Sequence, residues 1–194
     1  MKFIHLIIGC CILFQLASCV SPINCRKQFK IYREPVASYD SFDLYSGIFV
    51  SINGKDALCF YNNGYSKTIS SFPSNIISFW LNPEVEVTNL LENDKYFRKE
   101  LWGHFRIFND SIIIQTFGIS NDQLCRRSVY ETKGVILNDS TIVVFSDYSY
   151  WFDSELIKQP NIYRLYKTNL KPDSTLAWFN KKRWYKKNLH ESRR

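Results

Sequence analysis

Short apolar runs separated by turn-forming residues fill the central part of the chain. At 102–109 the polar residues His104 and Arg106 lie between apolar neighbours, which is the alternation of a half-buried strand. The other runs are of similar length and are rich in β-branched and aromatic residues, which favour strands. The strands predicted in this way span 47–52, 57–61, 65–72, 76–81, 102–109, 112–117, 133–137, 141–145 and 162–167.

Residues typical of tight turns join these runs. Asn53-Gly54 suits a hairpin because both central residues of such a turn need a positive φ, and Asn62-Asn63-Gly64 is a second turn signal. Asn109-Asp110-Ser111 and Asn138-Asp139-Ser140 each join two apolar runs, and their side chains can hydrogen-bond the local backbone. The pattern predicts consecutive up-and-down hairpins.

Many short strands with no regular alternation of strand and helix predict a mainly β domain. We expect an antiparallel up-and-down barrel, with a β-sandwich as the alternative. Gly47, Gly103 and Gly134 each precede an apolar run, and glycine in such a place is typical of a bend at a barrel corner. The stretch 83–100 is ambiguous, because it fits either a strand followed by a short helix or a structured loop.

The start of the chain has the pattern of an export signal. Lys2 is followed by an apolar run over 3–14, which is shorter than the roughly 20 residues of a membrane-spanning helix. Residues 16–19 read Leu-Ala-Ser-Cys, which resembles a bacterial lipobox. The resemblance implies cleavage after Ser18 and lipidation of Cys19. Ordinary cleavage to a soluble secreted protein and an uncleaved anchor are the alternatives.

The character of the chain changes again after Lys171-Pro-Asp-Ser-Thr175. Asp173 or Ser174 can cap a helix, and the aromatic and basic residues that follow predict a short C-terminal helix. Residues 178–194 hold seven basic residues and one acidic residue. An anionic membrane surface or an acidic partner is the contact expected for Lys181, Lys182, Arg183, Lys186 and Lys187. A solvated end is the alternative.

Composition adds limits to this interpretation. The chain has 194 residues, of which 45% are hydrophobic and 16% aromatic, so it can form a core and is not wholly disordered. The net charge of +7 comes mostly from the C-terminal end, because residues 19–177 hold 17 basic and 17 acidic residues. Export argues against nucleic acid as a partner. Besides Cys19 the mature cysteines are Cys25, Cys59 and Cys125, which allow one bridge, with Cys59–Cys125 as the conceivable pair.

Few residues suggest a catalytic or ligand-binding role. His104 and His190 are the histidines of the mature chain, and no readable set of nucleophile, base and orienting group surrounds either. We therefore expect no enzyme activity, no metal and no cofactor. Trp80, Trp102, Tyr150 and Trp151 are the candidate ligand-binding residues, since exposed aromatic rings can stack on sugars. Packing in the core is the alternative for these rings.

Several of these segments together resemble small lipoproteins of bacteroidete bacteria with lipocalin-like barrels. They are the lipobox, Leu58-Cys-Phe-Tyr-Asn-Asn-Gly64, Trp102-Gly-x-Phe-x-Ile107 and Lys171-Pro-Asp-Ser-Thr175. Where lipocalins open with Gly-x-Trp, this chain has Gly47-Ile48-Phe49. The expected division is a signal peptide over 1–18, a lipidated tether over 19–43, a barrel over 44–170 and a basic helix or tail over 171–194.

The resemblance implies a lipid-anchored envelope lipoprotein that binds a small apolar or glycan ligand in its barrel. The alternative is a structural or interaction lipoprotein whose barrel is filled and whose surface docks an envelope partner. Val20-Ser-Pro-Ile-Asn-Cys25 follows Cys19 in place of an acidic export signal. The expected location is therefore the outer membrane, facing the periplasm.

Overall fold

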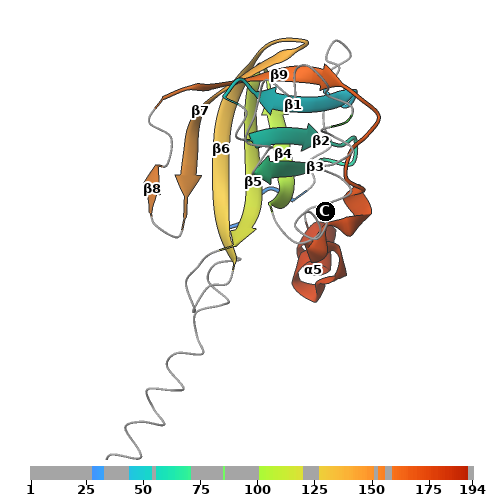
Figure 1. Cartoon of the computed structure of the whole chain (residues 1–194). Coiled ribbons are helices and arrows are strands. Elements are labelled where there is room, and N and C mark those ends of the chain that lie inside the picture. Colours follow the sequence, from blue (N-terminus) through green and yellow to red (C-terminus); the bar gives the residue numbers. More distant parts are fainter. Residues whose placement is uncertain are drawn as a thin grey trace, which may run out of the picture.

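Figure 1 shows the computed structural model of the chain, which describes residues 28–32, 44–53, 56–70, 85, 101–119, 127–150, 153–155 and 159–191. The strands are β1 (Gly47–Ser51), β2 (Asp56–Phe60), β3 (Tyr65–Ser70), β4 (Trp102–Phe108), β5 (Ser111–Ile119), β6 (Arg127–Asn138), β7 (Thr141–Ser149), β8 (Ser154–Glu155) and β9 (Asn161–Lys167). Two 3-10 turns, η2 (Ser174–Leu176) and η3 (Trp178–Lys181), precede the helix α5 (Arg183–Glu191).

Eight of these strands close into an antiparallel barrel (Figure 1). From β1 to β7 each strand pairs with the next one along the chain, and β9 pairs with both β7 and β1. The two-residue strand β8 pairs with the end of β7 and lies outside the closed sheet. The predicted up-and-down barrel is therefore confirmed, in preference to a sandwich, and so is the short C-terminal helix.

Most of the predicted strands are confirmed to within two residues at either end. Two are longer than predicted, because β6 begins at Arg127 and β7 continues to Ser149. The predicted strand 76–81 lies outside the described residues. The ambiguous stretch 83–100 also lies outside them except for Val85, which is helical and exposed.

One half of the barrel interior is packed with apolar side chains. It lies next to the tight turns at 62–63, 109–110 and 139–140, which are at the same end of an up-and-down barrel. Aromatic rings fill part of this half, since the Phe60 ring centroid lies 5.8 Å from that of Phe49 and 4.9 Å from that of Phe105. The other buried members are Leu44, Leu58, Ile112, Ile114, Ile136, Ile142, Val144 and Tyr163.

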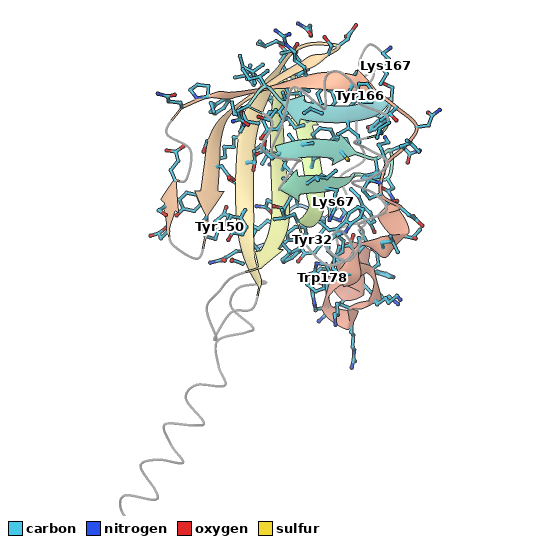
Figure 2. All side chains as sticks on the ribbon, in the orientation of Figure 1. Tyr32, Lys67, Tyr150, Tyr166, Lys167 and Trp178 are labelled. Atoms are coloured by element: carbon cyan, nitrogen blue, oxygen red, sulfur yellow. The ribbon has the colours of Figure 1, made fainter. Side chains whose placement is uncertain are left out.

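The C-terminal segment and residues 28–32 cover the outer face of β3 to β6 (Figures 1 and 2). This second cluster contains Phe29, Trp102, Phe117, Val129, Ala177, Phe179 and Tyr185. Burial beneath the C-terminal segment corrects one prediction, because His104, expected on the polar face of its strand, is fully buried. Its Nε2 lies 2.6 Å from the Tyr185 hydroxyl. Arg106 remains exposed, as expected.

Candidate functional site

The half of the interior away from the tight turns is lined by polar side chains. Every second residue of a strand faces the same side of the sheet, so the inward face of each strand can be followed from the apolar cluster. On β2 this face continues from Leu58 to Asp56, and on β9 it continues from Tyr163 to Asn161. Polar groups therefore replace apolar ones toward the start of both strands.

A β-bulge places a second carboxyl group in the same region. The register between β6 and β7 shifts at Lys133 and Gly134, so that β7 holds one extra residue between Val144 and Ser146. Val144 belongs to the interior cluster, and strict alternation would turn Ser146 inward after it. Because a bulge reverses the alternation beyond it, the inward position falls on Asp147 instead.

The neighbours of Asp147 confirm its position. Asp147 lies opposite Thr132, which in turn lies opposite Ile114 of the apolar cluster, and Thr132 Oγ1 donates a hydrogen bond of 2.9 Å to Asp147 Oδ1. Burial raises the pKa of Asp147, the hydrogen bond from Thr132 lowers it, and the charge of Asp56 raises it further. The two carboxyl groups are thus close enough for their charges to interact, and ionisation of both is unfavourable there.

A chain of hydrogen bonds links the neighbouring strands β1 and β9 in the polar half, next to these carboxyl groups. Ser51 Oγ donates to Asn161 Oδ1 at 3.0 Å, and Asn161 Nδ2 donates to the Tyr163 hydroxyl oxygen at 3.2 Å. Burial raises the pKa of Tyr163, and both the charge of Asp56 and a hydrogen bond with it raise that pKa further. The phenol of Tyr163 therefore stays protonated at neutral pH and can donate to Asp56.

Two other hydroxyl groups face the interior without a hydrogen-bond partner among the described residues. They belong to Ser66 and Ser128, each of which is 1% exposed. Ser66 lies opposite Phe60 of the apolar cluster, and Ser128 shares a face of β6 with Thr132, four positions further on. A buried hydroxyl without a partner costs about 1–3 kcal/mol, so these two groups are suited to receive hydrogen bonds from a bound molecule.

The interior wall beside Ser66 is made of small residues. Gly103 lies opposite Ser66, and Thr116 lies opposite Gly103. A Cβ atom on Gly103 would come within 1.8 Å of the carbonyl oxygen of Gln115, so the close approach of β4 and β5 requires glycine here. Small and polar side chains thus occupy the middle of this row, between Phe60 at one end and Tyr130, which lies opposite Thr116, at the other.

The predicted ligand-binding aromatics do not line this region where the structure describes them. Trp102 is fully buried on the outer face of the barrel, with the Lys67 ammonium 5.0 Å from its ring centroid. Tyr150 packs against the same outer cluster (Figure 2). Packing is thus the role that the structure supports for Trp102 and Tyr150. Trp80 and Trp151 lie outside the described residues.

The remaining predicted site residues divide into two groups. The five cationic residues Lys181, Lys182, Arg183, Lys186 and Lys187 are all exposed on η3, α5 and the residue between them. Ser18 and Cys19 lie outside the described residues.

The cysteine count left the pairing of Cys59 open, and the structure describes this residue. Cys59 is a free, fully buried thiol on the outer face of β2, so the Cys59–Cys125 disulfide that the count allowed is not formed. Burial raises the pKa of the Cys59 thiol to about 12, so it remains protonated at neutral pH. Cys25 and Cys125 lie outside the described residues.

The polar interior residues were missed by the sequence analysis for two reasons. Alternation could have placed Asp56 inside, since it lies two positions before Leu58, but it reads equally well as the end of a turn. Asp147 could not have been placed in this way, because the bulge reverses the alternation before it.

The described residues form neither a metal site nor a membrane-spanning helix. Among the described residues, no group of three or more His, Cys, Asp or Glu side chains could hold a metal ion. No helix in the described part of the chain is long and apolar enough to cross a membrane. Comparisons with known protein families, with curated proteins and with solved structures give no match.

Proposed function

We propose that this chain is a lipid-anchored envelope lipoprotein whose barrel binds a small, hydroxyl-rich ligand such as a glycan. The observation that carries the proposal is the pair of buried, unsatisfied hydroxyl groups of Ser66 and Ser128 in the barrel interior. A sugar offers both donors and acceptors, so it can satisfy these hydroxyls and bind the carboxyl groups of Asp56 and Asp147. A few polar groups that fix the orientation of a ligand are typical of small-molecule sites.

The packing of the apolar half favours a polar ligand over an apolar one. The Phe60 ring contacts those of Phe49 and Phe105 there, and all three side chains are at most 1% exposed. An apolar ligand would have to displace these rings, whereas a polar ligand would enter the half that carries unsatisfied groups. The ligand class proposed is therefore the glycan-like one.

A second candidate function is a non-catalytic interaction lipoprotein with a filled barrel. The same contacts among Phe49, Phe60 and Phe105 favour it, since a core packed in this way needs no ligand for stability. In that case the outer surface of the barrel would dock an envelope partner. Binding of a small molecule in the interior separates the two candidates.

Ligand-observed NMR of the full chain with a panel of neutral and amino sugars tests the proposed site. We expect at least one sugar to bind, and Thr132→Val to weaken its binding about tenfold, because the substitution removes a hydroxyl and the bond that orients Asp147. Ile142→Val removes one methyl group from the apolar half and is the matched control. Equal effects of the two substitutions, or no binding by any sugar, would support the filled barrel instead.

The proposed lipid anchor has its own test. Support for it comes from the apolar run over 3–14 and the Leu-Ala-Ser-Cys tetrapeptide that ends at Cys19. Cells expressing the full chain are labelled with a radioactive fatty acid, and we expect label in the wild-type protein and none in Cys19→Ala. Label that persists in Cys19→Ala would contradict lipidation at this residue.

A further inference from the structure

The helix α5 binds the barrel through one face. Trp184, Tyr185 and Leu189 pack into the outer cluster, and Asn188 Nδ2 donates a hydrogen bond of 2.8 Å to the Tyr32 hydroxyl oxygen. These positions follow the helical repeat, so they lie on the same side of the helix. Contact with the barrel therefore fixes which side of α5 faces outward.

The outward side is strongly basic. Lys182, Arg183, Lys186 and Lys187 are exposed between and beside the inward positions of the helix, and Lys181 is exposed at the end of η3. Glu191 is the one acidic residue between 178 and 194. Its carboxylate lies 3.8 Å from the Lys187 ammonium, and both side chains are more than half exposed, so this pair neutralises little of the charge.

The N-terminal part of the chain enters the barrel domain beside this helix. The ring of Phe29 stacks on Phe117 with 4.4 Å between centroids and lies 6.3 Å from the ring of Phe179. The backbone N–H groups of Lys30 and Ile31 both donate to Gln115 Oε1, at 2.8 and 3.0 Å. Residues 28–32 and α5 thus share one outer face of the barrel (Figure 2).

This shared face limits how far α5 can be from an anchor at Cys19. Nine peptide units separate Cys19 from Gln28, and even a fully extended chain of that length spans about 30 Å. A lipid on Cys19 would therefore keep α5 within reach of the membrane surface. Attraction to anionic headgroups acts within about 8–10 Å at physiological salt, and orientation by the anchor favours this contact.

We propose that the basic face formed by Lys181, Lys182, Arg183, Lys186 and Lys187 binds the anionic phospholipid headgroups of the membrane that holds the lipid anchor. The inference rests on the proposed function in one respect, because it takes the lipid on Cys19 as the first of two membrane contacts. A basic patch is a recognised electrostatic addition to a lipid anchor. The contact would also hold the barrel in one orientation on the membrane.

Lysine labelling of the full chain on lipid vesicles tests this contact. The purified protein is mixed with vesicles of phosphatidylcholine alone or with phosphatidylglycerol added, treated with an amine-acetylating reagent, and mapped by mass spectrometry. We expect the reactivity of Lys181, Lys182, Lys186 and Lys187 to fall about fivefold on anionic vesicles and to recover near 1 M salt. Lys133, an exposed residue of β6, is the internal control and should keep its reactivity.

A matched pair of double variants isolates the basic face. Lys186→Gln with Lys187→Gln removes two charges from it, and Lys133→Gln with Arg164→Gln removes two exposed charges from the barrel. We expect the first pair to restore the reactivity of Lys181 and Lys182 on anionic vesicles and the second pair to leave their protection intact. Equal reactivity on both vesicle types, or protection that survives the first pair, would overturn the proposal.

Vesicle flotation of the same samples separates the two proposals. Flotation with both vesicle types but no added protection on anionic ones would keep the lipid anchor and overturn the basic-face contact. Flotation with anionic vesicles alone, abolished by Lys186→Gln with Lys187→Gln, would support the contact and contradict the anchor. Flotation with neither, together with capture of an acidic protein through the same lysines, would overturn the membrane as the partner.

Discussion

At the scale of single residues, Asp147 is a carboxyl group in the barrel interior. It is partly buried, accepts one hydrogen bond from Thr132 and interacts with the charge of Asp56. Burial of an ionised carboxylate is unfavourable unless a partner compensates for the lost hydration. A protein keeps such a residue at a cost to stability when a ligand needs it.

This environment predicts how stability changes with pH. Burial raises the pKa of Asp147 above its unfolded value, so stability is highest below the unfolded pKa and declines as pH rises through the folded pKa. Asp147→Asn keeps an oxygen acceptor for Thr132 and removes the ionisation. We expect the variant to melt at a higher temperature than the wild type at pH 7 and the difference to disappear near pH 3.5.

The control for this prediction is Asp139→Asn, which changes an exposed turn carboxylate. Thermal melts of the three proteins between about pH 3 and pH 8 give the comparison. A lower melting temperature for Asp147→Asn at pH 7, or a difference from the wild type that does not depend on pH, would contradict the buried-carboxylate account.

A second residue-scale prediction concerns the Tyr185 hydroxyl. It lies 2.6 Å from His104 Nε2 and donates a bond of 3.3 Å to the Tyr65 hydroxyl oxygen, beneath the C-terminal segment. Tyr185→Phe removes this partner from a fully buried imidazole, so we expect a loss of about 1–3 kcal/mol in the free energy of unfolding by urea. Tyr32→Phe removes the hydrogen bond from Asn188 at a half-buried site and should lower the free energy of unfolding by less. A larger loss for Tyr32→Phe than for Tyr185→Phe would contradict this prediction.

At the scale of elements, the C-terminal segment up to Glu191 packs on the outer face of the barrel. Phe179 in η3 is fully buried, and its ring lies 4.7 Å from that of Tyr185 in α5 and 5.7 Å from that of Tyr65 in β3. One aromatic side chain thus joins the 3-10 turn, the helix and the sheet. Docking of α5 depends on this cluster, because a nine-residue helix is marginal on its own.

Substitution of Phe179 tests that dependence. We expect Phe179→Ala to lower the free energy of unfolding by about 3–5 kcal/mol and to speed amide exchange throughout α5. Leu176→Ala, in the neighbouring turn η2, changes a side chain that is 37% exposed and should cost less than about 1 kcal/mol. Slow amide exchange in α5 of Phe179→Ala would show that the helix does not depend on this contact.

The elements also show what the sequence could and could not predict. The strands and hairpins follow from alternation and Asn-rich turns, since both are local properties of the chain, but their number allows a barrel or a sandwich, and closure through β9 decides for the barrel. Burial of His104 could not be predicted, because it depends on a segment about 80 positions away in the chain that folds back over β4. The inward position of Asp147 depends on a bulge that alternation does not reveal.

At the scale of the whole molecule, the barrel is divided between a packed apolar half and a polar half. The apolar half supplies the core that a barrel of this size needs. The polar half holds Asp56 and Asp147, and the interior also carries the hydroxyls of Ser66 and Ser128, which have no hydrogen-bond partner among the described residues. The central claim is that the second half is a binding site.

Native mass spectrometry of the protein, purified gently from the cells that express it, tests this claim most directly. The account predicts a small polar molecule that leaves the wild-type protein on mild activation, is present after repeated purifications, and is lost from Thr132→Val but not from Ile142→Val. A wild-type protein that carries no such molecule in any preparation would contradict the claim and leave the filled barrel as the better description.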